Sequence, residues 1–265
     1  MAGAGPTTAE RGGRAEPSSG HPDEGGGGGR FRLPRPRLLL AVTAAALLTG
    51  GALWALYGSQ WLRVERVTTS GTEVLTREQV ESAARVPLGE PMASVDTDAV
   101  AERLRTALPR IDSVDVSRSW PHGIRLKVIE RQPVLLIEDG GKFVEIDDEG
   151  VRFATVARAP SGVPLLRMPD GRPAGSDRFG TGRLLREAVA VRGELPAGVA
   201  KETRAVRVRS YDSISLELSG GRTVMWGSGE DGAAKARALT ALMKAAPKAG
   251  HFDVSAPTAP AVSDS

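Results

Sequence analysis

Residues 38–57 read LLLAVTAAALLTGGALWALY, an uncharged and mostly apolar stretch. A helix needs roughly 20 predominantly apolar residues to cross the hydrocarbon core of a bilayer. The stretch follows a Gly- and Arg-rich N-terminal segment, and most of the chain comes after it. The sequence therefore predicts one transmembrane helix, in contact with membrane lipid, with a short tail on one side and the folded mass on the other.

The charges that flank this stretch predict its orientation. Four arginines precede it closely, whereas Arg63 and Arg66 after it are accompanied by Glu65. Because an excess of arginine is retained in the cytoplasm, we expect a cytoplasmic N-terminus and an extracytoplasmic bulk at the plasma (inner) membrane. A cleaved signal peptide is the alternative. The leading segment is long for one, the apolar run exceeds a signal core of about 7–15 residues, and no clear A-x-A site follows.

Composition excludes several classes of function. The chain has no cysteine, so it forms neither disulfides nor thiolate metal sites. Its net charge is only +3 and aromatic residues are scarce, which argues against nucleic-acid binding. Residues 1–37 are rich in Gly and Pro and poor in aliphatic residues, which predicts a disordered tail. Residues 257–265 hold Pro257 and Pro260 among small side chains and predict a flexible C-terminal tail.

The chain from about residue 62 to residue 131 predicts a β-α-α-β-β domain. A strand over 64–69 is followed by a helix that starts at Thr76 with a capping box and stops before Pro87. A second helix starts near Asp96. Alternating apolar residues then predict a hairpin with one buried face, turning at 121–123.

Residues 132–256 predict a second, mixed and β-rich domain. Strands are expected over 134–138, 142–146 and 151–153, and a long loop or partly ordered excursion over 159–182. A helix over 183–192, strands around 206–208 and 214–218, and a two-residue Gly220-Gly221 hairpin turn come next. A final helix over 232–246 and a last strand over 251–256 complete an α+β fold.

Motifs that suggest catalysis or cofactors are weak. Residues 227–232 match G-x-G-x-x-G, but Glu230 and Asp231 would repel a pyrophosphate, and the chain ends before a Rossmann sheet could form. The acidic turn over 147–150 lacks the spacing of a calcium loop. Nothing indicates that two of the three histidines converge. We therefore expect no catalytic residues, no cofactor and no metal, and hence a protein that is not an enzyme.

The order of short motifs resembles the FtsQ/DivIB family of bacterial cell-division proteins. The motifs are VTTSG at 67–71, LPRI at 108–111, VSRSWP at 116–121, VIERQPV at 128–134, DDEGV at 147–151 and FDVSAP at 252–257. The resemblance implies a membrane-anchored scaffold of the divisome, located at the division septum. It also implies a POTRA domain followed by an FtsQ-type β domain.

The resemblance further implies partners and a docking site. The family's partners are small bitopic coiled-coil proteins of the FtsB/DivIC and FtsL type, together with other divisome components. A partner strand adds to the edge formed by the last strand, here Phe252, Asp253, Val254, Ser255 and Ala256. On this reading Val254→Pro removes an N–H from the edge. Phe252 and Val254 could equally close the core, because strand residues alternate between faces.

Two alternative functions stay open at this point. One is a POTRA-type chaperone or transport component that binds exported polypeptides. The other is an anchored cell-wall enzyme or sensor with an unrecognised active site.

Overall fold

The structure, a computed structural model, describes residues 36–58, 60–168 and 180–264. Residues 1–35, most of the predicted tail, lie outside the described residues. The predicted membrane helix is present as α1, Pro36–Tyr57, with mean hydropathy 1.9 over its most apolar window and none of that window buried. An apolar helix of this length with no protein cover fits a membrane span.

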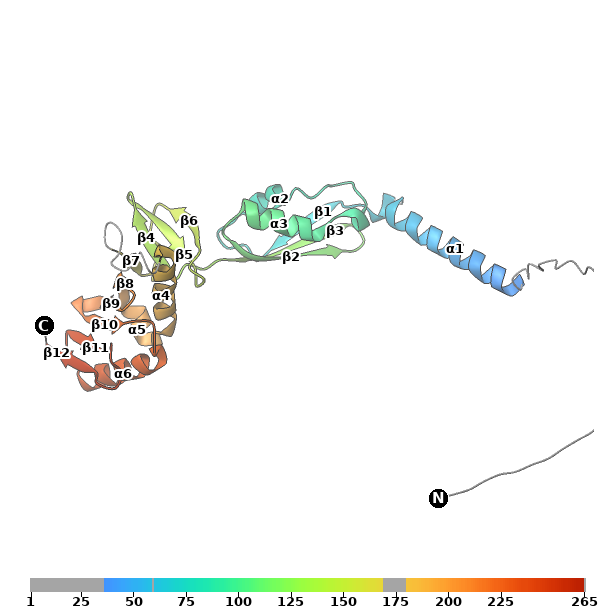
Figure 1. Cartoon of the computed structure of the whole chain (residues 1–265). Helices are drawn as coiled ribbons and strands as arrows, with labels where there is room; N and C mark the ends of the chain where they lie inside the picture. Colours follow the sequence, from blue (N-terminus) through green and yellow to red (C-terminus); the bar gives the residue numbers. More distant parts are fainter. Residues whose placement is uncertain (1–35, 59, 169–179, 265) are drawn as a thin grey trace, which may run out of the picture. The chain divides into compact units, whose positions relative to one another are not determined.

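The first folded part is a three-stranded sheet in the order β1-β3-β2, covered by two helices (Figure 1). A short 3-10 turn, η1, Gln60–Leu62, precedes it. The elements are β1 Arg66–Ser70, α2 Arg77–Ala84, η2 Met92–Ser94, α3 Thr97–Ala107, β2 Ile111–Ser119 and β3 Gly123–Glu130. The predicted β-α-α-β-β order is correct. The core residues of β3, Ile124, Leu126 and Val128, all point to the helices and are buried.

Both helices begin at the predicted caps. The side chain of Thr76 accepts the N–H of Gln79 and the Gln79 side chain accepts the N–H of Thr76, which is a complete capping box. The carboxylate of Asp96 accepts two N–H groups at the start of α3. Helix α2 ends at Ala84, and the next residue, Arg85, has the left-handed conformation two residues before Pro87.

The second folded part is a nine-stranded mixed sheet in the order β12-β11-β10-β9-β8-β7-β4-β5-β6. Its strands are β4 Leu135–Asp139, β5 Lys142–Ile146, β6 Arg152–Val156, β7 Leu165–Arg167, β8 Thr203–Ser210, β9 Ser213–Leu218, β10 Thr223–Gly227, β11 His251–Asp253 and β12 Ala261–Ser263. Helices α4 Thr181–Glu194, α5 Ala197–Glu202 and α6 Gly232–Ala245 contribute to its core. The α+β prediction is confirmed.

The structure gives the form of two predicted loops. The stretch 159–182 is partly ordered, because Leu165–Arg167 forms β7 and pairs in parallel with both β4 and β8, while residues 169–179 lie outside the described residues. Three residues are too few to show an alternating pattern, and partners on both sides stabilise the strand. The β9–β10 connection, η3, Ser219–Gly221, is a three-residue turn with positive φ at Gly220 and Gly221, closed by the Leu218 N–H to Arg222 C=O bond, rather than a two-residue turn.

Candidate partner-docking edge

The predicted site residues, 252–256, lie in and directly after β11, the strand next to the end of the sheet, and their side chains differ in burial. Phe252 and Val254 are both fully buried, so closing the core is what their side chains do. Asp253 is half-buried on the other face of the sheet. Ser255 and Ala256 are exposed and follow the end of β11. Any docking edge in this segment is therefore a matter of its backbone groups, whose directions decide what they can pair with.

The direction of each backbone group follows from one hydrogen bond. The N–H of Val254 donates to the carbonyl of Met225 in β10 at 3.0 Å, and the N–H of Thr223 donates to the carbonyl of Gly250 at 2.9 Å. In a strand the N–H and C=O of one residue point to the same side, and successive residues alternate. The backbone N–H and C=O groups of residues 250, 252 and 254 thus point toward β10. Those of His251 and Asp253 point to the opposite, outer side of β11.

This geometry corrects the prediction for Val254→Pro. The substitution would remove an N–H that bonds inside the sheet, and it would also disturb a core position. The residues whose backbone faces the outer side are His251 and Asp253.

The outer side of β11 is occupied by β12. His251 pairs with Ser263, Phe252 with Val262 and Asp253 with Ala261, all antiparallel. The prediction of a flexible tail over 257–265 is therefore wrong for residues 261–263, and the last strand of the sheet is β12 instead of β11. Strand β12 could not be predicted from the sequence, because a three-residue strand of small side chains after Pro260 carries no recognisable pattern.

A polar face of the sheet adjoins this edge. A hollow of about 340 Å³ lies over β8 to β11 and is lined by residues that include Arg207, Arg209, Glu217 and His251. Glu217 pairs with Arg207 and with Arg167, the latter at 3.1 Å. Thr223 Oγ1 and His251 Nδ1 lie 2.7 Å apart. Because the arginines outnumber the carboxylate, this face suits an acidic or hydrogen-bonding protein surface.

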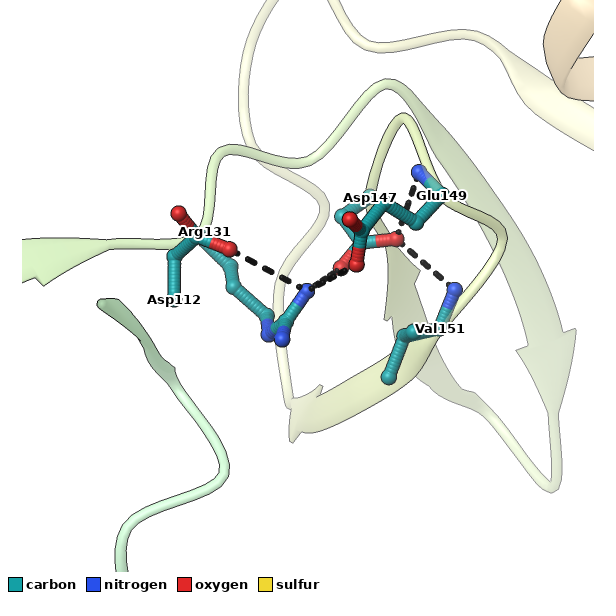
Figure 2. Close-up of polar contacts among 5 residues, drawn as sticks. All are labelled: Asp112, Arg131, Asp147, Glu149 and Val151. Atoms are coloured by element: carbon teal, nitrogen blue, oxygen red, sulfur yellow. Dashed lines mark hydrogen bonds and ion pairs between the residues drawn. The ribbon is translucent and has the colours of Figure 1, made fainter. Parts of the chain in front are cut away.

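The acidic turn over 147–150 is satisfied internally (Figure 2). Its central carboxylate, Asp147, is buried, pairs with Arg131, and accepts the N–H groups of Glu149 at 3.0 Å and Val151 at 2.7 Å. Arg131 also pairs with Glu149 at 3.2 Å and with Asp112 at 3.4 Å. Burial alone would lower the pKa of Arg131, but these carboxylates outweigh it and raise that pKa above its ordinary value. The cluster joins the segment after β3 to the turn after β5. These bonds account for the acidic residues of the turn, and no calcium ion is needed to explain them.

Nor does the G-x-G-x-x-G segment offer a phosphate site. A Cβ on Gly229 would lie 2.3 Å from a carboxylate oxygen of Glu187, and one on Gly232 would lie 1.0 Å from a carboxylate oxygen of Glu194. These glycines therefore make room for two carboxylates of α4, at the N-terminal end of α6, where a phosphate would have to lie. Lys235 is buried beneath the loop and donates to the carbonyl of Ser228 at 2.9 Å.

No cluster of three or more His, Asp or Glu side chains suited to a metal ion occurs within the described residues. The acidic turn and the glycine motif, the two segments that could have carried chemistry, are thus explained by packing and local hydrogen bonds.

Comparisons with known proteins match both folded parts. Residues 62–131 match the POTRA domain, FtsQ-type, and residues 135–255 match the cell division protein FtsQ/DivIB, C-terminal. The Cell division protein FtsQ of Streptomyces venezuelae is 61% identical over 99% of both chains. That of Streptomyces griseus is 70% identical over 78% of this chain and 100% of its own. That of Mycobacteroides abscessus is 31% identical over 96% of this chain and 78% of its own.

The solved structures that match include the major extracytoplasmic domain of the trans isomer of the bacterial cell division protein DivIB from Geobacillus stearothermophilus. It covers 44% of this chain and 93% of its own, with 20% sequence identity and a TM-score of 0.32.

Proposed function

The chain belongs to the FtsQ/DivIB family of cell-division proteins, and from this premise we propose that it is a non-enzymatic scaffold that docks partner proteins through the edge of its C-terminal sheet. It is a membrane-anchored component of the division machinery that interacts with other division proteins. Its docked partners, on this proposal, are small bitopic coiled-coil proteins of the FtsB/DivIC and FtsL type.

The single observation that supports docking is the edge itself. A sheet that ends in an exposed strand presents N–H and C=O groups that a partner strand can pair with. At this end of the sheet the terminal strand is the short, exposed β12, which pairs with the outward groups of His251 and Asp253 beside the polar hollow. Main-chain bonds would supply affinity there, and the arginines would add charge complementarity to an acidic partner.

The proposed orientation places the N-terminus in the cytoplasm and both folded parts outside it, at the septum. The arginine excess before α1 supports it. Because the chain has no cysteine, single cysteines introduced at Ser18 and at exposed Asp148 can be labelled separately in intact cells. A membrane-impermeant maleimide should label position 148 only, and labelling at position 18 alone would reverse the orientation.

The proposed partners are tested by affinity capture of the full chain from membranes. Asp253→Pro removes an outward N–H, whereas the matched control Asp253→Asn keeps that N–H and an oxygen for Ser255. We expect small bitopic coiled-coil proteins to be captured by the wild type and the Asn control and lost with Pro, provided that both variants unfold at similar temperatures.

The remaining outcomes separate the alternatives. Capture of unfolded exported polypeptides instead would favour the chaperone or transport function. If no division protein is captured by the wild type, the docking function is wrong and the enzyme or sensor alternative returns.

A further inference from the structure

We propose that β12 is a built-in occupant of the docking edge, and that a partner strand binds by replacing β12 antiparallel to β11. This inference rests on the proposed function and concerns the regulation of the same site. It follows from what β12 contributes to the fold, from the hydrogen bonds it offers, and from its neighbours in the sequence.

The core does not depend on β12. All three of its residues, Ala261–Ser263, are exposed, and Val262 keeps 41% of its surface. The neighbouring strand contrasts with it, because Phe252 in β11 and Val254 directly after it are both fully buried in the main hydrophobic cluster. Removal of β12 would therefore uncover backbone groups while leaving the packed interior in place.

The hydrogen bonds favour replacement over addition. His251 and Asp253 face outward, so their pairs with Ser263 and Ala261 are the hydrogen-bonded pairs, and the Phe252–Val262 pair is not. The backbone of Val262 consequently faces away from β11 and is the only residue within β12 to do so. A strand added outside β12 would find one residue to pair with, whereas a strand that replaces it would find both His251 and Asp253.

The sequence around β12 makes it a weak occupant. Pro257 and Pro260 lie in the connection from β11, and the ring of Pro260 leaves no N–H directly before the strand. A partner strand without these prolines can pair over a longer stretch. Val262 lies opposite Phe252 and hence on the same face of the sheet. The partner strand that fits is antiparallel, with an aliphatic residue at this position between two small ones.

The effect of β12 on partner affinity follows from the fraction of molecules in which the edge of β11 is open. A binding-competent fraction of about one-tenth weakens the apparent affinity of a partner about tenfold. A three-residue strand held by two hydrogen-bonded pairs is expected to be open, and the edge binding-competent, about one-tenth of the time. Freeing the edge should therefore tighten partner binding about tenfold.

The test uses the full chain in nanodiscs and the extracytoplasmic segment of the FtsB/DivIC-type protein from the same organism as the probe. Three variants are compared with the wild type: truncation after Ala256, Ser263→Pro and Val262→Pro. Ser263→Pro removes an N–H that faces β11, and Val262→Pro is its matched control because it removes only an N–H that faces away. We expect truncation and Ser263→Pro to bind about tenfold more tightly, and Val262→Pro to bind like the wild type.

Hydrogen exchange provides a readout that needs no partner. Truncation and Ser263→Pro should speed exchange of the amides at residues 251 and 253, and the probe at saturation should restore their protection. Equal affinity of all forms would overturn the replacement model and leave the docking function intact. Weaker binding after truncation or with Val262→Pro would show that the partner adds outside β12 and would also overturn it. If no form binds, the proposed function fails, and the inference fails with it.

Discussion

Glu130→Gln is expected to destabilise the first folded part of the chain strongly, although it replaces only one carboxylate oxygen by an NH₂ group. Glu130 is buried and ends β3. Its carboxylate accepts the N–H groups of three consecutive residues in the β1–α2 connection, Glu73 at 2.8 Å, Val74 at 3.1 Å and Leu75 at 3.0 Å. Leu75 also directly precedes the cap of α2. One side chain thus holds the entry to that helix.

The magnitude follows from these three bonds. A hydrogen bond to a charged group contributes about 1.5–3 kcal/mol, and such contributions do not add fully when they share one acceptor. Glutamine keeps one acceptor oxygen but turns an NH₂ group toward a donor and loses the charge. We expect a loss of about 3 kcal/mol in the free energy of unfolding of this part. For a domain of its size that lowers the unfolding temperature by roughly 12–24 °C.

The assay is native-state hydrogen exchange of the full chain in nanodiscs, followed in peptides from β1, α2 and β3. The matched control is Glu102→Gln, whose side chain is 69% exposed and pairs only with Arg105 on the surface of α3. That pair should contribute less than about 1 kcal/mol. A loss for Glu130→Gln no larger than the control's would refute the reasoning, because the three N–H groups would then find water or other acceptors at no cost.

Three further predictions concern backbone and charge. Gly71→Ala should cost at least about 2 kcal/mol more than Gly89→Ala in the same exchange experiment. Both glycines have φ near +84° (+83° and +84°), but only at Gly71 would a Cβ meet the backbone oxygen of Val128, at 2.1 Å, so equal losses would contradict the clash. Arg131→Met should lower the stability of β5 by about 3 kcal/mol by leaving a buried carboxylate unpaired, and a change below about 1 kcal/mol in its slowest amides would argue against this. Burial lowers the pKa of Lys235, so the native state binds fewer protons than the unfolded chain between that pKa and the ordinary value of 10.5. Stability should therefore rise with pH through this alkaline window, and a pH series on Lys235→Met should lack that rise.

The sequence motifs that resemble the FtsQ/DivIB family acquire physical roles in the structure. Glu130 of the Glu-Arg-x-Pro motif holds the β1–α2 connection, and Arg131 pairs with Asp147. Arg118, before the Trp-Pro turn, donates to the carbonyls of Met92 and Val95 at 3.0 and 2.6 Å. Each of these contacts joins segments far apart in the chain, so a motif could be seen in the sequence while its partner could not.

Local chemistry by itself determined the membrane helix, the two capped helices and the β2–β3 hairpin. An apolar run of membrane length, the Thr76 and Asp96 caps, and the alternating apolar residues of β2 and β3 can each be recognised within one segment. These features need no tertiary partner to be recognised, because hydrophobic periodicity and capping act between residues close in sequence.

Only the tertiary structure decided the strands β7 and β12 and the side of β11 that faces outward. Both strands have three residues, and each exists because a neighbouring strand pairs with it. The direction of the N–H of Val254 likewise depends on where β10 lies. Strand pairing joins residues far apart in the chain, and a three-residue segment has too little pattern of its own to reveal it. The edge at which a partner is proposed to dock was therefore located approximately by sequence and defined by the sheet.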